Sequence, residues 1–137
     1  MTLRAVLFLA VCVLLLFGVV AGQIALEGIT RSLGERTEEI LGLLSDGDLS
    51  RASDCFGDLA EEFGEKKPIL LILTHDGQVY GLERTLKGIR GNFARGDAAS
   101  VAGELETFLG LLREMGETHR PNWENILKFH ESFAIAS

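Results

Sequence analysis

The sequence predicts an all-α protein: an N-terminal transmembrane helix, then an antiparallel four-helix bundle made of two helical hairpins, then a short C-terminal helix. Three observations predict this fold class. An uncharged apolar run opens the 137-residue chain, apolar residues then recur at steps of three and four, and Gly-Asp pairs separate the periodic stretches. Such spacing is typical of amphipathic helices, and Gly-Asp suits the end of one helix and the N-cap of the next.

The N-terminal run is long enough to cross a membrane. Residues 5–26 contain no charged side chain, and as a helix they span about 33 Å, against about 30 Å of hydrocarbon in a bilayer. We therefore expect residues 1–26 to be a membrane anchor and residues 27–137 to be the helical domain. The alternative is a cleaved secretory signal ending near residues 19–21, although signal cores usually run about 7–15 residues.

Charge indicates the orientation and excludes one class of partner. Arg4 is the only charged side chain before Glu27, so the positive-inside tendency places the N-terminus in the cytoplasm and the domain outside the cell membrane; secretion is the alternative. Residues 27–137 carry 12 Lys and Arg against 20 Asp and Glu. Nucleic-acid-binding proteins usually show a basic surface, so no nucleic-acid partner is expected.

Two amphipathic helices are predicted after the anchor. The first is continuous with the anchor and carries an apolar stripe at Leu26, Ile29, Leu33, Ile40 and Leu43. Glu35, Glu38 and Glu39 lie outside this stripe and are expected to face water. The second helix carries its stripe at Leu49, Ala52, Phe56, Leu59 and Phe63. Gly64 and Pro68 are expected to end it.

Residues 69–94 present two conflicting patterns. Asp76-Gly77 between two β-rich runs is the usual signal of a β-hairpin. Against it, one unbroken series at steps of three and four runs through Ile72, His75, Val79, Leu82, Leu86, Ile89 and Phe93. Pro68 also suits the first turn of a helix. We therefore predict one long helix over residues 69–94.

The last elements repeat the same design. After Gly96-Asp97, a fourth helix carries its stripe at Ala98, Val101, Leu105, Phe108, Leu112 and Met115. Asn122 can cap a short C-terminal helix that holds Trp123 and Ile126. A weak echo at an offset of 49 residues matches Leu33, Ile40, Gly42, Gly47 and Asp48 to Leu82, Ile89, Gly91, Gly96 and Asp97. Either duplication or the shared demands of capping and core burial produces such an echo.

Two histidines are the candidate site residues. If the third and fourth helices pair about residues 95–96, His75 lies level with residues 115–119, within about a turn of His119. Together with Glu114 or Glu117 they could form a partial metal site or a pH-responsive pair. The alternative is that His75 is a hydrogen-bonded core histidine and His119 lies at a helix end.

The sequence contains no motif that predicts catalysis. The chain contains no phosphate-binding glycine motif and no nucleophile motif, so we expect neither enzymatic activity nor a cofactor. Cys55 lies beside the apolar stripe and is expected to be packed rather than reactive. Cys12 lies within the apolar run, so the two cysteines do not form a disulfide framework.

The chain resembles a family of small membrane-anchored bacterial helical proteins in three stretches: Leu70 to His75, Leu82 to Asp97 and Trp123 to Leu127. The family is described only as a domain of unknown function and is best represented in Gram-positive spore-formers. The resemblance implies helices through residues 69–94 and no established activity. Members often have an aromatic pair before the central His and an acid two places after it. This chain has Ile69-Leu70-Leu71 and Gly77 there.

The sequence thus predicts a membrane-tethered extracytoplasmic helical scaffold or protein-interaction module. Its partners would be the membrane, through residues 5–26, and a protein or a second copy of the chain. The alternative is an extracytoplasmic sensor-like domain that binds a metal or responds to pH through His75 and His119.

Overall fold

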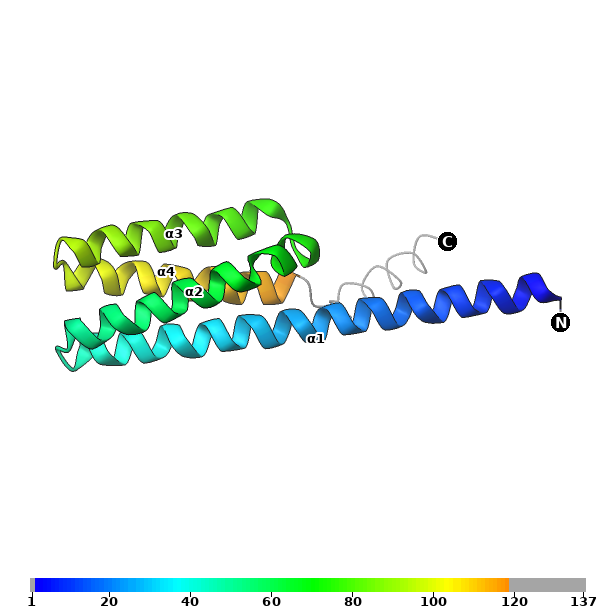
Figure 1. Ribbon diagram of the computed structural model, residues 1–137, viewed down its shortest axis with the longest axis horizontal. Helices are drawn as coiled ribbons and strands as arrows, with labels where there is room; N and C mark the ends of the chain where they lie inside the picture. The colour runs from blue at the N-terminus through cyan, green and yellow to red at the C-terminus, as the bar shows by residue number, and fades with distance from the viewer. Residues whose placement is uncertain (1, 119–137) are drawn as a thin grey trace, which may run out of the picture.

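The computed structural model describes residues 2–118, and every regular element in this part of the chain is a helix (Figure 1). The four helices are α1 (Leu3–Ser45), α2 (Leu49–Leu73), α3 (Asp76–Ala94) and α4 (Ala98–Thr118). Short turns join them, so successive helices run antiparallel. α1 packs on α2 and on α4, and α3 packs on α4, while the contact between α2 and α3 is smaller. The predicted all-α bundle is confirmed; the expected C-terminal helix lies outside the described residues.

α1 is one unbroken helix, about 65 Å long at 1.5 Å per residue. Its C-terminal half belongs to the bundle and buries Leu26, Ile29, Leu33, Gly34, Thr37 and Ile40. Its N-terminal half projects beyond the other helices (Figure 1). There the apolar side chains are exposed, from Leu3 to Ile24. This stretch is long and apolar enough to cross a membrane, although a signal sequence near an N-terminus has the same properties.

The core consists of most of the stripe residues that the sequence predicts, although Ala98 is exposed and Leu43 and Leu49 are only partly buried. α2 buries Ala52, Phe56, Leu59 and Phe63, and α4 buries Val101, Leu105, Phe108, Leu112 and Met115. α3 contributes Val79, Leu82, Leu86 and Ile89. The rings of Phe56 and Phe93 lie 5.4 Å apart, centre to centre, and join α2 to α3. Apolar burial of this kind supplies most of the stability of a small bundle.

The turns after α1 and after α3 are built alike. Gly47 (φ 79°) and Gly96 (φ 69°) adopt the left-handed conformation that glycine favours. In each turn the N–H groups of the glycine and of the following aspartate bond back to the preceding helix, at 2.9–3.1 Å. Asp48 and Asp97 then cap the next helix, each accepting a hydrogen bond from the backbone N–H three residues later at 3.1 Å. The 49-residue echo therefore places the same turn chemistry at both hairpins.

The expectation that Gly64 and Pro68 end the second helix is wrong. α2 continues through Pro68 to Leu73. Proline inside a helix removes a hydrogen bond and costs about 3 kcal/mol. Full burial of Leu70 one half-turn later offsets this cost, because the last turns of α2 are needed to cover the core. Local propensity is here overridden by packing.

The predicted single helix over residues 69–94 is also wrong. The chain leaves α2 at Thr74 (φ −131°, ψ 177°), whose hydroxyl bonds the Leu70 carbonyl at 2.9 Å, and His75 (φ −72°, ψ 136°) precedes α3. Ile72 and His75, placed on the seam by their spacing, are both exposed. The three-and-four spacing continues across the break by coincidence, because two helices join there. The rejection of a β-hairpin at Asp76-Gly77 is confirmed, since α3 begins at Asp76.

Polar side chains link neighbouring helices. Glu62 of α2 pairs with Arg36 of α1 and accepts a hydrogen bond from Ser32 at 2.5 Å. Lys67 of α2 pairs with Glu83 of α3. These partly buried contacts help to set which faces of the helices meet.

Candidate functional site

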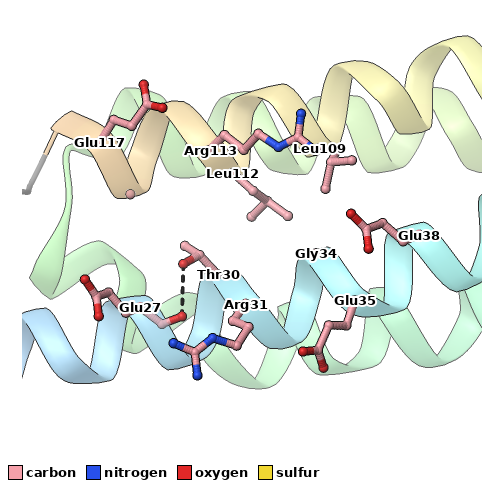
Figure 2. A pocket seen from close by; sticks show the side chains of 11 residues that line it. Glu27, Thr30, Arg31, Gly34, Glu35, Glu38, Leu109, Leu112, Arg113 and Glu117 are labelled. Carbon is pink, nitrogen blue, oxygen red and sulfur yellow. Dashed lines mark hydrogen bonds between the residues drawn. The ribbon is translucent and has the colours of Figure 1, made fainter.

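A groove of about 410 Å³ lies between α1 and α4 (Figure 2). We call it the α1–α4 groove. It is lined by Glu27, Thr30, Arg31, Gly34, Glu35, Glu38, Leu109, Leu112, Arg113, Gly116 and Glu117. It is open along the surface rather than enclosed, which suits an extended or helical polypeptide better than a small molecule.

Two glycines make room for the α1–α4 groove. Gly34 of α1 faces Leu109 of α4, and a Cβ built on Gly34 would lie 3.6 Å from the Leu109 Cδ1 atom, in ordinary contact. On Gly116 a Cβ would meet nothing within 4 Å. Larger side chains at these positions would fill the hollow. Leu109 and Leu112 are more than nine-tenths buried and form an apolar floor.

The rim of the α1–α4 groove is mainly acidic. Four glutamates line it against two arginines: Glu27, Glu35, Glu38 and Glu117 against Arg31 and Arg113. Figure 2 shows Thr30 and Glu38 pointing from α1 toward α4, whereas Arg31 and Glu35 point away from α4. The carboxylate of Glu38 therefore points toward the helix that supplies the apolar floor, and a cationic group beside an apolar side chain would complement it.

The α1–α4 groove begins where the exposed apolar part of α1 ends. Its first lining residue, Glu27, directly follows the uncharged residues 5–26. From Glu27 to Glu38 the α1 wall is part of the same unbroken helix. At 1.5 Å per residue this wall covers about 17 Å along the helix axis. Any segment bound here would lie close to the end of the apolar stretch.

A second, smaller hollow of about 240 Å³ lies between α2 and α3, and we call it the α2–α3 groove. It is lined by Ala60, Phe63, Gly64, Lys67, Glu83, Leu86, Lys87 and Arg90. Three of these are cationic and one is anionic. The hydrogen bond between Lys67 and Glu83 raises the pKa of Lys67 and lowers the pKa of Glu83. The charged residues that line the two grooves therefore differ in sign: they are mainly acidic in the α1–α4 groove and mainly basic in the α2–α3 groove.

The predicted histidine pair is not brought together by anything that the structure describes. His75 is an exposed residue at the N-cap of α3, on the turn that follows α2. His119 lies outside the described residues. Glu114 and Glu117 are exposed in the last turns of α4. Within residues 2–118 no group of three or more His, Cys, Asp or Glu side chains is arranged to hold a metal ion.

Both cysteines are free thiols in partly buried positions. The pKa of Cys55 is raised by burial first and by the nearby carboxylate of Glu39 second. A raised pKa reduces the thiolate fraction at neutral pH, so Cys55 is a poor nucleophile. This agrees with the expectation that Cys55 is packed rather than reactive.

Sequence reasoning missed the α1–α4 groove. It placed Glu35 and Glu38 on the solvent side of α1, and both are exposed. The opposite wall of the groove comes from α4, some 70 to 90 residues later in the chain. Periodicity reveals which face of each helix is buried, but not which helices are neighbours. Gly34 and Gly116 carry the only local signal, small residues beside an apolar stripe, and that signal is weak.

A comparison with known protein families, with characterised proteins and with solved structures found no match for this chain. Function is therefore inferred from the fold and from the two grooves.

Proposed function

We propose that this chain is a membrane-tethered helical scaffold without catalytic activity, and that its α1–α4 groove binds a helical segment of a partner protein. The observation that carries the proposal is the lining of this groove. An apolar floor, Leu109 and Leu112, lies between acidic rims contributed by two helices. Grooves of this kind accept amphipathic helices, whose apolar residues at helical spacing contact the floor. Lysine or arginine beside those anchors complements the rim.

The tether restricts which partners can reach the groove. In this proposal residues 5–26 cross the membrane, with Arg4 on the cytoplasmic side and the bundle outside. The groove then begins at Glu27, immediately beyond the hydrocarbon. A segment that lies close to its own membrane span fits this position, so the favoured partner is another membrane protein.

A second copy of the chain is the other occupant to test. The acidic α1–α4 groove and the cationic α2–α3 groove lie on different faces of the bundle, one between α1 and α4 and the other between α2 and α3. A contact that joins unlike faces is heterologous and extends into rings or filaments instead of stopping at a dimer. The mass of a cross-linked product distinguishes this from a different partner.

Site-directed photo-cross-linking in native membranes tests the proposal. A photoreactive amino acid replaces Glu38 in the groove or, as a matched control, the neighbouring Glu39, which is exposed but does not line the groove. We expect discrete adducts from position 38 and none from position 39. The adducts should disappear when Glu27, which lines the groove, is replaced by lysine. They should persist when Glu61, an exposed residue of α2, is replaced by lysine. Equal cross-linking from both positions would contradict the groove as the binding surface.

A further inference from the structure

Exposed apolar side chains in the bundle are confined to one corner. Beyond Ile24, the exposed large hydrophobic side chains among the described residues are Ile69 (42% exposed), Ile72 (83%) and Tyr80 (46%). All three flank the turn between α2 and α3. We call this region, residues 68–80, the α2–α3 corner. Single exposed apolar residues are common on proteins, but several at one end of a bundle, with the most exposed one in the last turn of a helix, indicate an interaction surface.

The α2–α3 corner also lacks charge where it turns. From Pro68 to Thr74 the sequence is Pro-Ile-Leu-Leu-Ile-Leu-Thr, and the first ionised side chain after Lys67 is Asp76. The opposite end of the bundle has the reverse character: its two turns contain Asp46, Gly47 and Asp48 in one and Arg95, Gly96 and Asp97 in the other. The bundle therefore has one polar end and one apolar end.

The apolar end is the one from which the apolar part of α1 projects (Figure 1). The contact between Gly22 and Leu73 shows which part of α1 lies beside the corner. A Cβ built on Gly22 would lie 3.2 Å from the Leu73 Cδ2 atom. Gly22 is still within the uncharged residues 5–26. The first charge after that run, Glu27, follows five residues and about 7.5 Å later along the helix. The corner is therefore level with the last turns of the apolar run.

Lys67, just before the corner segment, and Tyr80, at its end, are residue types that suit the layer just outside the hydrocarbon. The Lys67 ammonium lies 5.4 Å from the centre of the Tyr80 ring. Tyrosine and lysine are both favoured at the membrane–water interface, where the apolar part of the side chain contacts lipid and the polar end reaches water. Lys67 and Tyr80 therefore suit such an interface, and they accompany the exposed apolar side chain of Ile72.

We propose that the α2–α3 corner is a second membrane contact, which inserts Ile69 and Ile72 into the outer part of the same bilayer that α1 crosses. The inference rests on the proposed membrane tether. It holds the bundle against the lipid surface at two places instead of on one helix alone. The α1–α4 groove lies between the other two helices of the bundle, so it stays open to a neighbouring membrane protein.

Depth-dependent quenching tests this contact with the full chain in phosphatidylethanolamine–phosphatidylglycerol vesicles. In a background with Cys12→Ser and Cys55→Ser, an environment-sensitive fluorophore is attached at one of three positions, Ile72→Cys, Asp46→Cys or Leu14→Cys. Asp46, on the polar end, is the matched exposed control, and Leu14, mid-span, reports the tether. Nitroxides are placed on lipid chains at a shallow or a deep carbon.

We expect the label at position 72 to be quenched mainly by the shallow nitroxide, the label at 14 by the deep one, and the label at 46 by neither. Without a fluorophore, Ile72→Cys should react with a membrane-impermeant maleimide several-fold more slowly than Asp46→Cys. If position 14 is quenched while position 72 behaves like position 46, the corner contact is wrong and the tether stands. If neither 14 nor 72 is quenched, both are wrong. Quenching at 72 without 14 would uphold the corner and overturn the spanning tether.

Discussion

The carboxylate of Glu104 in α4 occupies the space that a side chain at position 88 of α3 would need. A Cβ built on Gly88 would lie 2.6 Å from the Glu104 Oε2 atom. The other oxygen, Oε1, accepts a hydrogen bond from the buried Asn92 side-chain amide at 2.8 Å, and Arg95 donates to the Asn92 side-chain oxygen Oδ1. This network joins α3 to α4 at one axial position, since a slip along either helix would leave buried polar atoms unpaired.

The first prediction concerns Gly88→Ala. Alanine in a helix interior normally stabilises a protein by about 0.5–1 kcal/mol relative to glycine. Here the added methyl group displaces Glu104 and breaks its bond to Asn92, so we expect the free energy of unfolding to fall by about 1 kcal/mol. Gly81→Ala, in the same helix with nothing within 4 Å of its Cβ, should be stabilising. Urea unfolding of the full chain in detergent measures both, and equal stabilisation would contradict the role of Gly88.

The second prediction is that Leu86→Asp unfolds the bundle. Leu86 is 6% exposed, in the middle of the buried face of α3. Loss of a buried leucine costs about 2–5 kcal/mol, and an unpaired buried carboxylate adds to this. Small domains have about 5–15 kcal/mol in total. Arg84→Asp, two residues earlier and exposed, is the control and should retain the helical circular dichroism that Leu86→Asp loses.

The third prediction concerns acid. Hydrogen bonds from the Ser100 hydroxyl, at 2.6 Å, and from the Ser100 N–H lower the pKa of Asp97 below its ordinary value of 3.8. Because the pKa of Asp97 is lower in the folded than in the unfolded state, the ionised carboxylate stabilises the folded state at pH values above the unfolded-state pKa. This stabilisation is lost as the pH falls through the folded-state pKa. Asp97→Asn keeps a cap and should therefore reduce the loss of stability below about pH 4. Ser100→Ala should raise the Asp97 pKa, as followed by NMR titration, and no change would contradict the assignment.

The fourth prediction separates the scaffold from a histidine sensor. His75 is exposed on the turn before α3, so His75→Gln should leave the melting temperature of the full chain nearly unchanged. Zinc should have no effect on either protein. A zinc-induced rise in the parent that is absent in His75→Gln would instead favour a metal site that includes His75, with His119 as the next residue to replace.

The fifth prediction is that residues 1–26 remain on the mature protein. The uncharged run of residues 5–26 is longer than most signal cores, and α1 passes from it into the bundle without a break. Carbonate-washed membranes should therefore retain the protein, and its intact mass should include the N-terminus. A soluble protein that begins near residue 22 would identify a cleaved signal.

Two kinds of local signal predicted most of the fold. Buried stripes such as Phe56 with Leu59 and Leu105 with Phe108 follow from helical spacing, because a helix can bury only one face. The turns follow from chemistry within a few residues: glycine supplies the left-handed conformation and aspartate caps the next helix. Both signals are contained in short stretches of the chain.

The sequence-based predictions fail where the structure depends on contacts between distant parts of the chain. Pro68 locally favours a helix boundary, and only the demand for Leu70 in the core extends α2 beyond it. Asn92 is buried because Glu104 of another helix pairs with it. The α1–α4 groove likewise exists only once α1 and α4 are neighbours.

Because α1 is unbroken, a tilt of its apolar part in the bilayer also tilts the bundle. An apolar helix that exceeds the local hydrocarbon thickness tilts, so bilayer thickness sets its angle. Because the helix that is expected to meet the lipid is also a wall of the α1–α4 groove, the angle is conveyed to the bundle without a hinge. From Leu26 to Ser45 the arm is about 30 Å, so a tilt of about 10° moves its outer end sideways by about 5 Å. In a thinner bilayer the groove would therefore present itself at a different angle to its neighbours.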